Sequence, residues 1–93
     1  MKVITQATSI RAAVKHLLSD SDDERVVAVA YVGADALSFL PAPKGLTVYC
    51  WAQAGGTNPY AIEELIRAGV EVRFVRRLHA KVYWSRNRGA LIG

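Results

Sequence analysis

Blocks of apolar residues alternate along the chain with segments in which apolar residues recur at helical spacing. Nearly continuous Val and Ala at residues 25–32 predict a strand that is covered on both faces, because a half-exposed strand would alternate with polar residues. Residues 46–52 and 70–75 predict two further strands, and the short segment 2–6 predicts another. The apolar blocks therefore mark the strands of one sheet.

The segments between these strands predict helices. Apolar residues at helical spacing place an amphipathic helix at residues 9–19, and residues 34–40 allow one or two helical turns before two prolines. A third helix begins after Asn58, which is a good N-cap, and Gly69 is a natural residue to follow its end. Its predicted buried stripe consists of Ile62, Leu65 and Ile66.

The end of the chain has a different pattern. Residues 78–85 predict a strand, residues 88–93 begin another, and the SRNRG turn between them predicts an antiparallel hairpin. The complete order is β-α-β-α-β-α-β-β-β. It predicts one α/β domain over residues 1–93, with a mixed, mostly parallel sheet and helices on its faces.

Charge divides the chain unequally. Residues 1–50 carry equal numbers of acidic and basic residues, whereas residues 51–93 carry seven basic and three acidic ones and hold the whole net charge of +4. Between Arg73 and Arg88 there are six basic residues and no acid. This asymmetry favours an anionic partner, and a solvated basic edge is the alternative that charge alone leaves open.

Other features exclude several kinds of site. A single cysteine, Cys50, excludes an internal disulfide, and its apolar neighbours predict a buried strand residue. The acidic segment 19–24 predicts a solvated turn, and His16 a residue on a helix surface. The longest apolar block is too short to span a membrane and the first ten residues lack the apolar core of a signal peptide, so we expect a cytoplasmic protein.

A histidine and a lysine lie two residues apart in the predicted strand 78–85. Because side chains alternate along a strand, the two groups leave the backbone on the same side, about 7 Å apart. An imidazole and an ammonium at this spacing can converge on one phosphate, which lysine binds and histidine can attack. An ordinary polar strand face is the alternative. One side of the strand then carries His79, Lys81 and Tyr83, and the other, against the core, carries Ala80, Val82 and Trp84.

The tail HAKVYWSRNRGALIG, residues 79–93, resembles the signature of the phospholipase D superfamily, which is His-x-Lys, four residues, Asp, six residues and Gly. Gly93 falls at the position of the glycine, but Arg86 stands where the signature has Asp. The preceding GGTNPYAIEELIRAGVEVR, residues 55–73, is similar to the segment before the signature in small bacterial members. The resemblance implies a phospholipase D-like fold that is incomplete after residue 93.

The resemblance also implies an activity. It implies a metal-independent phosphodiesterase without a cofactor, in which His79 is the nucleophile or the acid and Lys81 binds phosphate. Since the chain holds one such motif, a homodimer would supply the second. Single-motif members are mostly bacterial nucleases, so DNA or RNA is the implied substrate, bound by a basic surface of Arg73, Arg76, Arg77, Arg86 and Arg88.

Two other functions remain open from the residues. The first is a non-catalytic module that binds nucleic acid or a protein through the basic C-terminal hairpin. The second is an α/β domain with a purely structural role, which would have no affinity for phosphate at His79 and Lys81.

Overall fold

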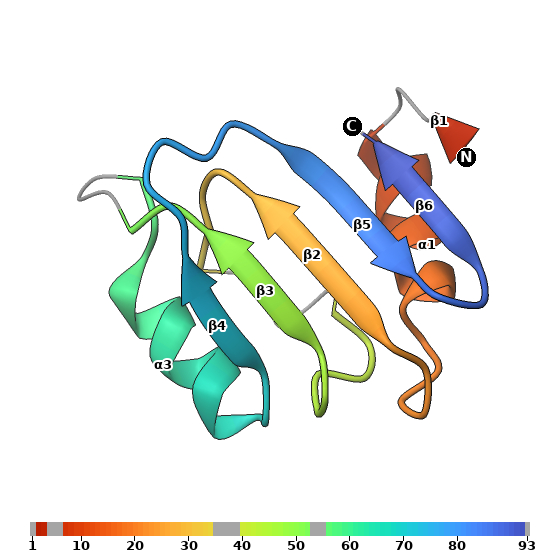
Figure 1. Ribbon diagram of the computed structural model, residues 1–93, viewed down its shortest axis with the longest axis horizontal. Coiled ribbons are helices and arrows are strands. Elements are labelled where there is room, and N and C mark those ends of the chain that lie inside the picture. The colour runs from red at the N-terminus through yellow and green to blue at the C-terminus, as the bar shows by residue number, and fades with distance from the viewer. Residues whose placement is uncertain (1, 4–6, 35–39, 53–55, 93) are drawn as a thin grey trace.

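The computed structural model describes residues 2–3, 7–34, 40–52 and 56–92. Its strands form one six-stranded sheet in the order β1-β6-β5-β2-β3-β4 (Figure 1). The elements in chain order are β1 (Lys2–Val3), α1 (Ala7–Leu17), β2 (Arg25–Val29), β3 (Thr47–Cys50), α3 (Pro59–Arg67), β4 (Glu71–Phe74), β5 (Lys81–Ser85) and β6 (Gly89–Ile92). The helical turns predicted at 34–40 fall mainly on residues 35–39, outside the described residues.

The sheet is mixed, as the sequence predicts. Strands β2, β3 and β4 run parallel to one another, and β1 is parallel to β6. Strand β5 is antiparallel to both of its neighbours, β2 and β6. The predicted hairpin is confirmed, because Ser85 and Gly89 are paired across the turn between β5 and β6. The α/β class is therefore confirmed.

Helix α3 begins and ends where the sequence indicates. The Asn58 side-chain oxygen accepts hydrogen bonds from the backbone N–H groups of Tyr60, at 2.9 Å, and Ala61, at 3.2 Å. Gly69, with φ of +93°, follows the C-cap residue. The predicted stripe is partly wrong, because Ile66 is 56% exposed and Ala61 is buried beside Ile62. The helix packs at the sheet edge, against β4, where only a narrow stripe is covered.

The hydrophobic core lies on one face of the sheet. Strand residues of that face, such as Val27 and Val48, join buried residues of both α1 and α3 in a single cluster. Figure 1 shows α1 behind β5 and β6. The sequence predicts helices on the faces of the sheet, and the two described helices, α1 and α3, lie on the same face. None of the described helices is long and apolar enough to span a membrane.

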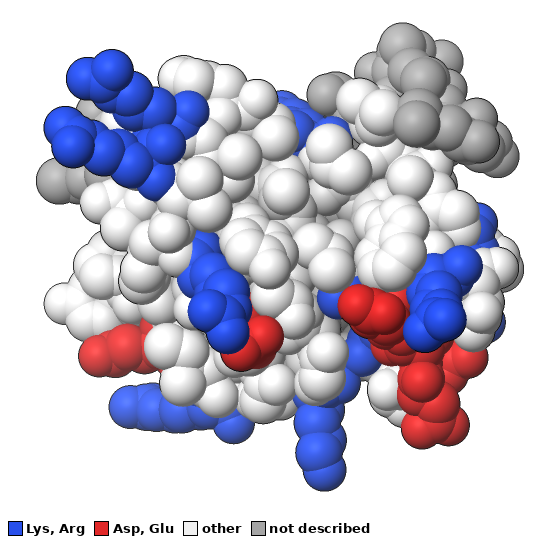
Figure 2. Space-filling model, viewed as in Figure 1, with Lys and Arg blue, Asp and Glu red and all other residues white. Residues whose placement is uncertain are grey.

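The opposite face of the sheet is apolar but only half-buried. Val26 and Ala28 lie on it, as do their partners across the strands, Trp84 and Val82. Figure 2 views this face and shows mostly uncharged side chains over its middle. The sequence predicts the wrong side of β5 to lie against the core. Tyr83 packs into the core and Trp84 faces away from it, because the two described helices cover the Tyr83 side.

Candidate functional site

The predicted histidine and lysine lie at the end of the sheet where parallel strands β2 and β3 finish. The Ala30 N–H donates to the Ala80 carbonyl at 3.1 Å, and the Trp51 N–H donates to the Ala30 carbonyl at 3.0 Å. Lys81 is paired with Val29 in the adjoining register. Because β5 is antiparallel to β2, its first residues meet the carboxyl ends of the parallel strands, where ligands of open α/β sheets usually bind.

The His79 side chain is exposed and makes a contact with an aromatic ring. Its ring centroid lies 5.6 Å from that of Trp51, with the planes at 74°. Trp51 in turn stacks on Tyr31, with centroids 6.2 Å apart and planes at 19°. An edge-to-face contact of this kind is worth about 0.5–1.5 kcal/mol and restrains a ring without covering it. The imidazole is therefore positioned and open to a ligand.

His79 lies outside the strand in which it was predicted. Strand β5 begins at Lys81, so His79 belongs to the connection from β4. Strand alternation consequently fixes the direction of Lys81 and not that of the imidazole. The contact with Trp51 provides that restraint instead.

Lys81 is exposed and lies on the helix-covered face of the sheet, as its pairing with Val29 requires. It helps to line a pocket of about 320 Å³, together with Tyr31 and Tyr83. Burial raises the pKa of the Tyr83 phenol above its ordinary value, so its hydroxyl stays protonated at neutral pH. The pocket therefore has an ammonium and a phenol among its lining groups.

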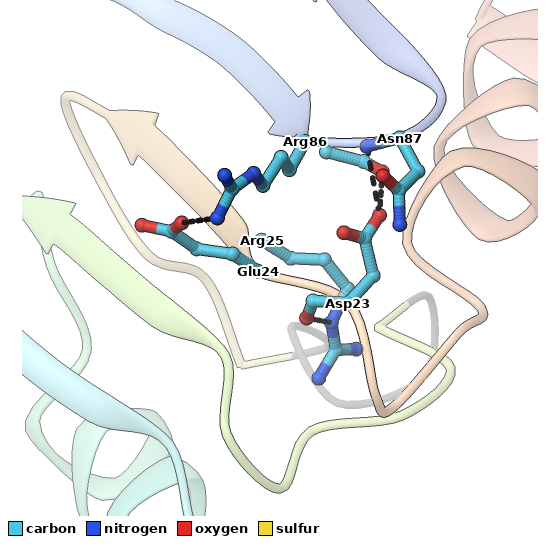
Figure 3. Close-up of polar contacts among 6 residues, drawn as sticks. Asp23, Glu24, Arg25, Arg86 and Asn87 are labelled. Atoms are coloured by element: carbon cyan, nitrogen blue, oxygen red, sulfur yellow. Dashed lines mark hydrogen bonds and ion pairs between the residues drawn. The ribbon is translucent and has the colours of Figure 1, made fainter.

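Three of the five predicted arginines are engaged elsewhere. The Arg73 guanidinium pairs with Glu71 at 2.9 Å, and that of Arg86 approaches Glu24 at 3.9 Å (Figure 3). Arg88 donates hydrogen bonds to the His16 carbonyl and to the Ser19 hydroxyl. Arg86 and Arg88 also follow the end of β5 opposite to His79. The predicted basic surface is thus not one continuous patch.

Arg76 and Arg77 lie in the same connection between β4 and β5 as His79. Both are exposed in the connection between β4 and β5, and neither pairs with a carboxylate among the described residues. Figure 2 shows basic side chains gathered at the end of the sheet where this connection lies. Arg77 has φ of 59°, a left-handed conformation that is uncommon for a residue with a side chain. The site therefore contains His79, Lys81 and these two arginines.

Two buried charged residues were not predicted. The carboxylate of Asp23, read as part of a solvated turn, is buried and accepts hydrogen bonds from the Ser85 hydroxyl and from the Asn87 N–H, the latter at 3.2 Å (Figure 3). The Ser85 hydrogen bond is the main cause that lowers the pKa of Asp23. A carboxylate thus contacts the segment around position 86, although it comes from the turn before β2.

Arg25 is the other buried charge. Its guanidinium donates to the carbonyl groups of four residues in two loops, with N–O distances of 2.5 to 3.1 Å. The four acceptors are Leu18, Asp23, Ala42 and Lys44. The sequence feature that could have indicated this role is an arginine as the first residue of an otherwise apolar strand. In the structure Arg25 holds loops together at the end of the sheet opposite to His79.

The remaining predictions concern reactive and metal-binding groups. Cys50 is fully buried, and burial raises the pKa of its thiol, so the predicted buried strand residue is confirmed. His16 is exposed on α1, as predicted. Among the described residues no group of His, Cys, Asp and Glu side chains is arranged to hold a metal ion.

Comparisons of the chain with models of protein families, with curated proteins and with solved structures found no match in any of the three.

Proposed function

We propose that this chain is a metal-independent phosphodiesterase in which His79 attacks phosphorus and Lys81 binds the phosphate. The observation that carries the proposal is the placement of the two side chains. An exposed imidazole and an exposed ammonium lie two residues apart at the carboxyl ends of β2 and β3, and the lysine lines a pocket. The resemblance of residues 79–93 to the phospholipase D signature supports the same chemistry.

The proposed reaction has two steps. An imidazole nitrogen of His79 forms a bond to phosphorus while the ester bond to one oxygen breaks, and a second histidine protonates that leaving oxygen. Water then attacks the phosphohistidine: its oxygen bonds to phosphorus, the bond between phosphorus and the His79 nitrogen breaks, and the second histidine, neutral after the first step, accepts the water proton. Lys81 stabilises the negative charge on the phosphate oxygens in both steps.

The second histidine would come from another copy of the chain. The sequence contains two histidines, and His16 lies at the end of α1, where its carbonyl contacts Arg88 of the β5–β6 hairpin. That hairpin is at the opposite end of β5 from His79. A symmetric homodimer that brings two His79 side chains together would complete the site.

Nucleic acid is the first substrate to test. Arg76 and Arg77 lie in the same connection as His79 and are free of carboxylate partners within the described ranges. Cations so placed would contact phosphates that flank the one being cleaved. Arg73, Arg86 and Arg88 support this substrate less, because they contact acids or α1.

The test is cleavage in excess EDTA. Single-stranded DNA, RNA and bis(p-nitrophenyl) phosphate would be incubated with the protein and with His79→Ala, Lys81→Met and His16→Ala. We expect turnover by the unaltered protein and by His16→Ala, and a loss of at least about a hundredfold in the other two. Turnover that requires Mg²⁺, or that survives in His79→Ala, would refute the proposal.

A non-catalytic nucleic-acid-binding module is the second candidate, and Arg86 at the position of the signature's Asp favours it. Such a module would bind DNA or RNA without cleavage, with an affinity that falls steeply with salt. His79→Ala would leave that affinity nearly unchanged. Arg76→Gln with Arg77→Gln would reduce it and flatten its salt dependence.

A further inference from the structure

The pocket beside Lys81 has walls that are unlike a polynucleotide groove. It lies on the helix-covered face of the sheet, below the end of β2, and has a volume of about 320 Å³. Val29, Ala30 and Leu65 are among its apolar lining residues. This volume is near the lower limit of about 300–1,000 Å³ for ligand pockets. It therefore suits one small organic group.

Among the lining residues that the structure describes, the polar side chains are one amine and two phenols. Lys81 contributes an ammonium, and Tyr31 and Tyr83 contribute phenols. A lysine can lay its apolar stem along such a wall while its charge stays at the mouth. The pocket thus combines an apolar interior with a cation that can hold an anion at its entrance.

A nucleobase fits these walls poorly. Its edge carries several donors and acceptors, and each that is buried without a partner costs about 1–3 kcal/mol. An aryl or alkyl group has no such groups and gains free energy in proportion to the apolar area it buries. The part of the lining that the structure describes therefore favours an apolar group over a base.

We propose that this pocket binds the apolar organic group of a small phosphate ester, with the ester's phosphate held at the entrance by Lys81. The inference rests on the proposed function and narrows it, because it selects small esters with an aryl or alkyl group over polynucleotides. His79, held against Trp51 near the same entrance, would then face the phosphate and not the organic group.

The test uses phosphonates, which have no ester bond to cleave and therefore report binding alone. Dissociation constants for phenylphosphonate and methylphosphonate would be measured by NMR titration. Burial of the phenyl ring predicts at least about tenfold tighter binding of phenylphosphonate. Lys81→Met is expected to weaken both ligands, since both share the anionic group.

Two substitutions on β2 distinguish an effect of the pocket from a general effect of enlarging a side chain on the sheet. Val29→Phe places extra volume in the pocket and is expected to remove the preference for phenylphosphonate. Val26→Phe makes the same change on the half-buried opposite face and is expected to retain that preference. Thermal unfolding of both variants would verify that each remains folded before binding is compared.

The outcomes distinguish this inference from the proposed function. Equal affinities for the two phosphonates, or a preference that Val29→Phe does not change, would overturn the pocket assignment even if phosphodiesters are cleaved. A preference that is retained in His79→Ala and lost in Val29→Phe would support the pocket assignment even if no substrate is cleaved. Tighter binding of a dinucleotide than of phenylphosphonate would also overturn it.

Discussion

The Ser85 hydroxyl donates a hydrogen bond to the Asp23 carboxylate, which lies 62 residues earlier in the chain. Together with the Asn87 N–H, it joins the turn before β2 to the hairpin between β5 and β6. Both residues that form the contact are buried. This contact holds the antiparallel hairpin against the parallel part of the sheet, and so fixes one end of the strand that carries Lys81.

The Asp23 contact predicts a loss of stability in acid. Hydrogen bonds from Ser85 and Asn87 lower its pKa from the ordinary value of 3.8, so its stabilising contribution is complete above that value. The contribution is lost as the pH falls through the lower folded-state pKa. We therefore expect the difference in unfolding free energy between the unaltered protein and Asp23→Asn to be constant at neutral pH and to shrink as the pH falls below 3.8. Urea denaturation at several pH values measures it.

Asp22→Asn is the control for that experiment. Asp22 is exposed in the same turn and contributes no carboxylate to the hairpin among the described contacts. Its substitution should leave the pH dependence of stability unchanged. A pH dependence that is the same in Asp23→Asn as in the unaltered protein would contradict the prediction.

Substitution of Arg25 is expected to lower the stability of the fold strongly without altering the candidate site around His79. Arg25→Met would leave four carbonyl groups without their donor, and a loss of roughly 2–4 kcal/mol in unfolding free energy is expected. Arg25→Lys should recover only part of it, because an ammonium cannot span the same acceptors. Arg86→Met, which removes an exposed ion pair, should cost less than about 0.5 kcal/mol. Equal losses for Met at both positions would refute this role of Arg25.

The local features of the fold could be predicted because the residues that encode them are adjacent in sequence. Asn58 and Gly69 mark the ends of α3 through their own backbone preferences, and the turn between Ser85 and Gly89 marks the hairpin. The hairpin in turn indicated that the sheet is mixed. Each of these features depends on a few neighbouring residues and not on distant packing.

The predictions that were wrong concern features that depend on which face of the sheet the helices cover, or on contacts between distant segments. An alternating strand has two faces, and its sequence alone does not show which of them the helices cover, so Tyr83 and Trp84 were assigned to the wrong sides. Asp23 was read as solvated because its partner, Ser85, is distant in sequence. For the site, the pairing of His79 with Trp51 also joins distant segments, and no periodicity could indicate it.

Substitution of Arg77 by glycine is expected to stabilise the fold and to weaken phosphate binding. A residue with a side chain at φ of 59° stores roughly 1 kcal/mol of strain that glycine would not. Arg77→Gly is therefore expected to raise the unfolding free energy slightly and to weaken phosphate binding, as measured by urea denaturation and by phosphate titration. Arg76→Gly is the matched control, because it removes the same charge without relief of strain. Its unfolding free energy should fall, and a similar fall in Arg77→Gly would contradict the prediction.

A side chain at position 56 is expected to disturb the aromatic contacts beside His79. A Cβ atom at this position would lie 2.3 Å from Cδ1 of Tyr31, so an alanine must displace the ring. Displacement would disturb the stacking of Tyr31 on Trp51, whose edge contact restrains His79. We expect Gly56→Ala to cost roughly 1–3 kcal/mol in unfolding free energy and to change the near-ultraviolet circular dichroism of these rings.

A double-mutant cycle tests whether that cost arises from the Tyr31 ring. In a Tyr31→Ala background the space that the new methyl group needs is already empty, so Gly56→Ala should cost much less than in the unaltered protein. Residues in contact typically show an interaction free energy of about 0.5–3 kcal/mol in such a cycle. Costs that are equal in the two backgrounds would mean that Gly56 acts on the backbone alone, and that the close approach of the ring does not position the aromatic residues beside His79.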